Sequence, residues 1–137
     1  MPLLRLYPFL IPLVVGLFCE ATKIVCEGIR TGNWHEGIFR AGGMPSTHSA
    51  FVMSLLIVVW RKLGVESTDF AIAVVFAVIV WYDAMHSRRE IGEQAKVLNR
   101  LQKWSHFAER VGHSGLEVAG GIIFGAVVTW IGIWLSA

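Results

Sequence analysis

Few residues of this 137-residue chain could do chemistry, because 55% of it is hydrophobic and only 16% is charged. Two of its five histidines have suggestive neighbours. His113 precedes Glu117 by one helical turn, so that carboxylate could accept from one ring nitrogen and leave the other free to attack. His48 follows an expected helix start and could protonate a departing oxygen. A nucleophile and an acid of this kind suit hydrolysis of a phosphate monoester.

Basic residues and a helix start supply groups that would hold the phosphate. Lys23 and Arg30 are seven residues apart, so both project from one face of a helix. A helix beginning after Pro45 offers free N–H groups and the positive end of its dipole. Paired arginine forks suit bidentate contacts to phosphate. The predicted phosphate-binding residues are Lys23, Arg30, Ser46, Thr47, Arg88 and Arg89.

The elements that position these residues are predicted to be transmembrane helices, because an apolar run of about 20 residues crosses a bilayer. The chain has one domain, residues 1–137, with an all-α fold and about four spans. A further segment has apolar residues at spacings of three and four, which predicts an amphipathic helix at the membrane surface, or one packed against other protein. The spans are Tyr7–Ile29, Ser46–Trp60, Thr68–Met85 and Gly115–Leu135, and the amphipathic positions are Ile91, Ala95, Leu98, Leu101 and Trp104.

Four crossings bring the unusual polar residues to one face of the membrane, as expected where buried charges serve a site. Asp83, near the end of the third span, could compete with Glu117 for a histidine. The site face carries nine basic residues and the other face three, which predicts a multi-pass protein of the plasma (inner) membrane with a cytoplasmic site. The nine are Lys23, Arg30, Arg40, Arg88, Arg89, Lys96, Arg100, Lys103 and Arg110; the three are Arg5, Arg61 and Lys62.

At these positions the sequence resembles the phosphatidic acid phosphatase type 2 and vanadium haloperoxidase superfamily, whose pattern is Lys-x6-Arg-Pro, Pro-Ser-Gly-His and Ser-Arg-x5-His-x3-Asp. Here Thr31 replaces the first proline and Thr47 the glycine, and 24 residues separate Arg88 from His113. The chain looks most like the short divergent membrane branch of that superfamily. Matching segments are Gly42–Ala50 (GGMPSTHSA), Tyr82–Ala84 (YDA), Gly92–Asn99 (GEQAKVLN) and Gly112–Val118 (GHSGLEV).

The resemblance implies a lipid phosphate phosphatase that works without metal or other cofactor. His113 would become phosphohistidine, Glu117 would orient it, and His48 would be the general acid. The basic residues named above would hold phosphate, with Arg88 and Arg89 both candidates for the Ser-Arg role. The expected substrate is phosphatidylglycerophosphate, otherwise phosphatidic acid.

Two other functions fit the residues. A non-enzymatic transporter or binding protein for a lipid phosphate could use the same basic site. A metal hydrolase could use the pairs Asp83/His86 and His113/Glu117, although the nearby basic residues would repel a cation. A net charge of +2 indicates no nucleic-acid partner. The G-x-x-x-G spacing of Gly121 and Gly125 predicts close helix packing, within one chain or across a homodimer.

Overall fold

The computed structural model describes residues 8–32, 34 and 43–136, and within these residues every regular element is a helix. The all-α prediction is confirmed. Each expected span boundary lies within about three residues of a helix end; Tyr7, Arg5, Arg40 and Gly42 lie outside the described residues. The helices are α2 (Leu10–Thr31), α3 (Thr47–Leu63), α4 (Thr68–Met85), α5 (Ser87–Leu101) and α6 (Gly115–Ser136).

Local capping explains where these helices begin and end. The Ser67 hydroxyl accepts a backbone N–H three residues on and starts α4. Gly32 and Gly64 have φ of 75° and 80°, a region that favours glycine, and they end α2 and α3. Ser114 and Glu117 form a capping box at α6, in which each backbone N–H donates to the other's side chain.

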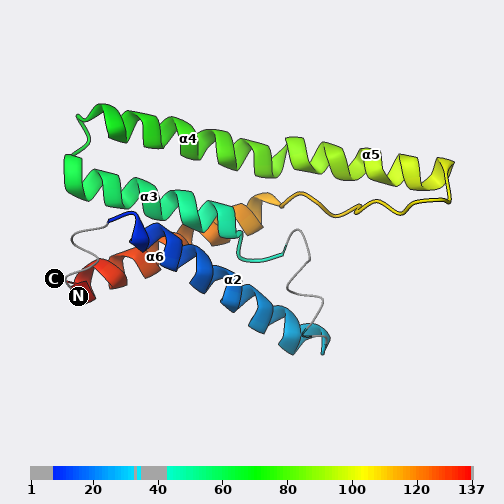
Figure 1. Cartoon of the computed structure of the whole chain (residues 1–137), viewed down its shortest axis with the longest axis horizontal. Coiled ribbons are helices and arrows are strands. Elements are labelled where there is room, and N and C mark those ends of the chain that lie inside the picture. Colours follow the sequence, from blue (N-terminus) through cyan, green and yellow to red (C-terminus); the bar gives the residue numbers. More distant parts are fainter. Residues whose placement is uncertain (1–7, 33, 35–42, 137) are drawn as a thin grey trace.

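Helix α3 lies at the centre of the bundle and packs against α2, α4 and α6 (Figure 1). The C-terminal end of α2, the start of α3, the end of α4 and the start of α6 point to the same side of the bundle (Figure 1). This is the convergence that the alternating crossings predict. The core between the helices contains Ile11, Val15, Cys19, Ala50 and Val58, with Phe124, Val128 and Ile133 packed against it.

The glycine pair of α6 packs within the chain. A Cβ on Gly121 would meet the Ser46 carbonyl oxygen, and one on Gly125 would meet the carbonyl of Ala50. The G-x-x-x-G spacing therefore lets α6 approach the backbone of α3, which is the first of the two expected kinds of packing. A homodimer stays a prediction.

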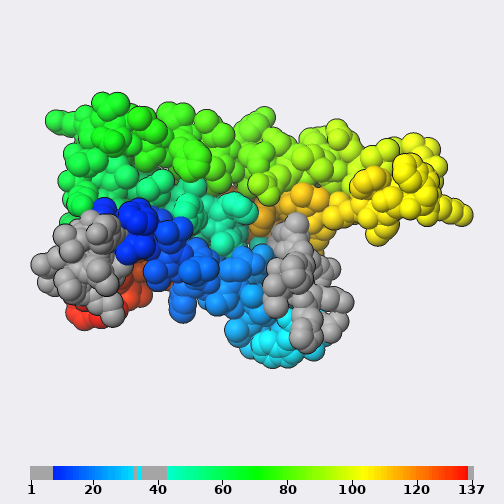
Figure 2. All heavy atoms as spheres, in the orientation of Figure 1, coloured from blue at the N-terminus to red at the C-terminus, as the bar shows by residue number. Residues whose placement is uncertain are grey.

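Helix α5 does not lie across the end of the bundle (Figure 1). It prolongs α4 after a turn at His86, and its far end projects beyond the rest of the molecule (Figures 1 and 2). Together Thr68–Leu101 make 34 residues, about 51 Å of helix against about 30 Å of hydrocarbon. The chain 102–114 returns along α5 and contacts it where Gly92 meets the Glu109 carbonyl. Of the predicted amphipathic positions only Ala95 is buried, and Ile91, Leu98, Leu101 and Trp104 are exposed, so both expected surroundings of this face, a membrane surface and other protein, stay predictions.

Within the part of the chain that the structure describes, two helical stretches are long and apolar enough to cross a membrane, Thr68–Leu101 and Gly115–Leu135. They contain the third and fourth expected spans. Helix α3 has 17 residues, about 25 Å, and α2 has charged residues in its second half. The first two spans therefore stay predictions.

Candidate functional site

A cavity of about 200 Å³ lies where α3, the α4–α5 junction and the segment before α6 meet. Its volume equals that of about seven waters at about 30 Å³ each, enough for a phosphate group and small for a larger ligand. Four of the predicted site residues share it, although they are far apart in the sequence. Its polar lining is His48, Asp83, Arg88 and His113, and its apolar wall is Ile79, Val80 and Ala84.

His113 is a buried side chain, 8% exposed, in the segment just before α6. Its backbone N–H donates to the Ala84 carbonyl at 3.0 Å, which fixes the segment against the end of α4. Its Nδ1 is buried and has no hydrogen-bond partner. Burial lowers the pKa of the imidazole; the Glu117 charge opposes this shift, and the charges of His48, Lys23 and Arg88 add to it. The ring is therefore held neutral, the form that can act as a nucleophile.

The two carboxylates expected to compete for a histidine are engaged elsewhere. Glu117 accepts from the Ser114 N–H at 2.7 Å and from Arg110 at 3.3 Å. Asp83 accepts from Nε of Arg88 at 2.8 Å. Among the described residues neither bonds to the ring of His113. Glu117 therefore acts on His113 through its charge and by starting α6, and Asp83 orients Arg88 in the cavity.

Neither Lys23 nor Arg30 lines the cavity. Lys23 is joined to the start of α3, because the Glu20 carboxylate accepts from both the Lys23 ammonium and the Thr47 hydroxyl. Arg30 is exposed in the last turn of α2 and lines neither of the cavities described here. The seven-residue spacing places them about 10 Å apart along the helix, and it is Lys23 that Glu20 connects to Thr47, the residue before His48.

Ser46 and Thr47 have their hydroxyls committed to other groups. The Ser46 side chain is fully buried and accepts from Ser49 at 3.0 Å, and Thr47 donates to Glu20 at 2.6 Å. Because Ser46 does not cap α3, that helix begins without a side-chain cap. Its first backbone N–H groups remain the means by which this segment could bind an anion.

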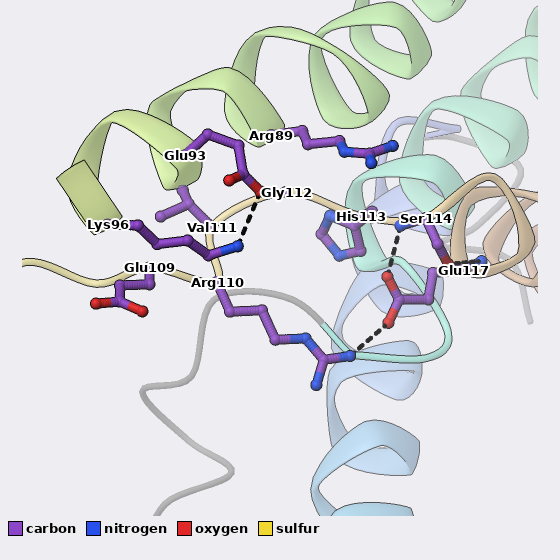
Figure 3. Close-up of a pocket in the computed structure, with 10 residues that line it drawn as sticks. All are labelled: Arg89, Glu93, Lys96, Glu109, Arg110, Val111, Gly112, His113, Ser114 and Glu117. Carbon is purple, nitrogen blue, oxygen red and sulfur yellow. Dashed lines mark hydrogen bonds and ion pairs between the residues drawn. The ribbon is translucent and has the colours of Figure 1, made fainter.

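A second, larger cavity of about 540 Å³ lies on the other side of His113, between α5 and the returning chain (Figure 3). Its charges are mostly paired: Lys96 contacts Glu93 at 2.8 Å, and Arg110 contacts Glu117. Arg89 lines this cavity and not the smaller one, and its guanidinium extends along the segment that carries His113 (Figure 3). The two candidates for the Ser-Arg role are thus separated, with Arg88 beside both histidines.

The returning chain is held to α5 by the matched segment Gly92–Asn99. The Asn99 amide donates to the Phe107 carbonyl and the Glu109 carboxylate and accepts from the Phe107 N–H, each at 2.9 Å. A Cβ on Gly92 would meet the Glu109 carbonyl, so glycine is needed where the two backbones touch. These contacts bring Gly112 and His113 back to the end of α4.

Two of these roles were missed by sequence reasoning. Glu20 contacts both Thr47 and Lys23, and its signal is a carboxylate in an apolar stretch three residues before Lys23. Asn99 has no sequence signal beyond its place in the family-like segment, because its partners, the Phe107 backbone and the Glu109 carboxylate, lie in the returning chain, eight and ten residues later. For metals, the described part of the chain has no group of three or more His, Cys, Asp or Glu side chains arranged to bind one.

The fold and the site define an all-helical protein with membrane-length apolar helices and a compact histidine–arginine site at one end of its bundle. The chain belongs to the divergent PAP2 family, whose model matches residues 4–128. It is similar to the uncharacterized membrane protein YuiD of Bacillus subtilis (strain 168), with 33% identity over 153 aligned positions that cover 96% of each protein. No solved structure gives a significant match to the chain.

Proposed function

We propose that the protein is a membrane phosphatase that hydrolyses a lipid phosphomonoester through a phosphohistidine. The observation that carries the proposal is the shared cavity of His48, Arg88 and His113, which the sequence separates widely. Membership of the divergent PAP2 family supports the same chemistry. The apolar wall of the cavity suits a substrate whose remainder lies in the bilayer.

In the proposed reaction, the neutral ring of His113 attacks phosphorus and the bond from phosphorus to the lipid oxygen breaks. His48 donates a proton to that oxygen, which leaves as the lipid alcohol. Water then attacks the phosphohistidine, His48 takes a proton from it, and inorganic phosphate leaves. Arg88 and Lys23 stabilise the charge on the transferred group.

The proposed substrate is phosphatidylglycerophosphate, hydrolysed to phosphatidylglycerol, with phosphatidic acid as the second choice. Both carry a terminal phosphate on a diacyl lipid made at the cytoplasmic leaflet. This choice rests on the proposed orientation, in which the excess of basic residues places the site in the cytoplasm. Labelling of a cysteine introduced at position 34 in intact cells tests it, since modification there by an impermeant reagent would place the site outside.

The test of the chemistry is phosphate release by the purified protein from these lipids and from an activated aryl phosphate. His113→Ala should abolish turnover of both. His48→Ala should slow the lipid about 10²–10⁴-fold, and the aryl phosphate less, because a good leaving group needs little protonation. His106→Ala removes an exposed histidine from the returning chain and should change neither rate. Equal losses on both substrates would count against His48 as the acid.

Inhibition separates this mechanism from the two alternatives. Vanadate, an analogue of the five-coordinate phosphoryl group, should inhibit at low concentration. A chelator should leave the rate unchanged; a rate that survives saturating vanadate and falls with a chelator would favour a metal hydrolase. Binding of lipid phosphate with no release of phosphate from any substrate would favour a transporter or binding protein.

A further inference from the structure

Glu20 joins α2 to the start of α3 beside the candidate site. One carboxylate oxygen accepts from the Thr47 hydroxyl at 2.6 Å, and the other accepts from the Lys23 ammonium at 3.1 Å. The Lys23 side chain is 13% exposed and that of Glu20 is 36% exposed, so the lysine is mostly covered and the carboxylate is partly open to water. The carboxylate therefore fixes a lysine on one helix relative to the first residue of another.

The two hydrogen-bond partners of Glu20, Thr47 and Lys23, are both connected to the candidate site. Thr47 is the residue before His48, so holding Thr47 fixes the turn from which the proposed acid projects. Lys23 shares the Glu20 carboxylate with Thr47, so its ammonium is held beside the first turn of α3. Helix α3 has no side-chain cap, so the contact with Glu20 is a side-chain tether for its first residue. A carboxylate in an apolar helix is costly, and such groups persist where they serve a site.

We propose that Glu20 is a positioning residue, which holds the Lys23 ammonium and the first turn of α3 so that Lys23 and His48 face the same phosphoryl group. This inference rests on the proposed function. The alternative is that the Glu20 carboxylate has no positioning role. A negative charge with no positioning role would only repel an anion, and its removal would tighten anion binding.

The experiment compares orthovanadate affinity and lipid phosphate turnover in the wild-type protein and in Glu20→Gln. The amide can still accept from Thr47 but no longer pairs with the charge of Lys23. Loss of a charge-assisted contact should weaken vanadate binding and lower kcat/KM about ten- to one-hundredfold. Thr47→Val should lower kcat more than vanadate affinity, because it frees the turn of His48 and leaves Lys23 paired.

Two matched variants control for the loss of a charge and of a hydroxyl. Glu66→Gln removes an exposed carboxylate in the loop between α3 and α4, at the end of α3 remote from Thr47. Thr22→Val removes a hydroxyl on α2 that bonds only to its own helix, at the Phe18 carbonyl. Both should stay within about twofold of wild type, the range of a surface substitution.

Vanadate affinity keeps this inference separate from the proposed function. If the wild-type protein binds vanadate but releases no phosphate, the proposed function fails and the affinities still decide the role of Glu20. Equal or tighter vanadate binding by Glu20→Gln overturns the positioning role, as does a wild-type protein that binds no vanadate. If Glu20→Gln does not fold, Glu20→Asp decides: it keeps the charge but is too short for both contacts, so wild-type affinity and turnover would refute positioning.

Discussion

Adding a single methyl group at Gly112 should displace His113 without changing any side chain proposed to take part in the reaction. A Cβ added there would lie 2.7 Å from the backbone nitrogen of Arg89 and 2.9 Å from its Cα. Both atoms belong to the backbone, so no side chain can swing aside. Ordinary contact begins at 3.4 Å, and the returning chain must therefore shift by about 0.7 Å, one residue before the proposed nucleophile.

The expected result of Gly112→Ala is a large loss of turnover with a small loss of stability. A misplacement of about 1 Å reduces rates about 10²-fold, so we expect a ten- to one-hundredfold fall in kcat. The exposed returning chain can yield, and the unfolding free energy should fall by less than the about 1–3 kcal/mol typical of overpacking in a core. Phosphate release and thermal unfolding, measured on the same preparation, check the two quantities.

Gly115→Ala is the matched control, since it adds the same methyl group three residues later, where no atom lies within 4 Å. Its turnover should remain within about twofold of wild type. If the two alanine variants have equal turnover, the close approach of Gly112 to Arg89 does not position His113, and the reasoning is refuted.

Three further predictions follow from the same contacts. Because burial lowers the pKa of His113, kcat/KM should rise with pH through a midpoint below about 6.5, and a midpoint above 6.5 would contradict a buried neutral ring. For the same reason, acid should destabilise the fold as the pH falls from the pKa of the unfolded state toward that of the folded state. Arg88→Gln should reduce turnover more than Arg89→Gln, because only Arg88 lines the smaller cavity; the reverse order would assign the Ser-Arg role to Arg89. Gly125→Ala should lower the unfolding free energy by about 1–3 kcal/mol, since its Cβ would meet the backbone of Ala50, whereas the Cβ of Gly132→Ala has no atom within 4 Å; equal melting temperatures would refute the intrachain packing of α6.

The helices and their common polar end could be predicted because they depend on local rules. Apolar length, the Ser67 cap and the Ser114–Glu117 capping box are all visible in the sequence, and they set the bounds of α4 and α6. Because successive spans run in opposite directions, the end of one span and the start of the next lie on the same side of the bundle, whatever the details of packing. This is why His48, Asp83 and His113 were correctly expected on one side of the bundle.

Side-chain partners could not be predicted in the same way, because several groups compete for each hydroxyl. A serine or threonine at a helix start usually caps that helix, but the Ser46 hydroxyl accepts from Ser49 of the same helix, and Thr47 donates to Glu20 of α2. The surroundings of α5 could not be predicted from the sequence either. Its amphipathic pattern fits a membrane surface or a protein surface equally well. The returning chain, held by Asn99, leaves Ile91, Leu98 and Leu101 exposed, so it does not decide between them.

The spacing of 24 residues between Arg88 and His113, against five in the superfamily pattern, has a geometric explanation. Helix α5 leads the chain away by about 22 Å, at about 1.5 Å for each of its 15 residues. The 11 residues 102–112 can span up to about 36 Å when extended, more than enough to return. The excursion begins and ends at the same place, where Arg89 touches Gly112. Motif spacing along the chain is therefore a poor measure of this site, and the shared cavity of Arg88 and His113 is the better one.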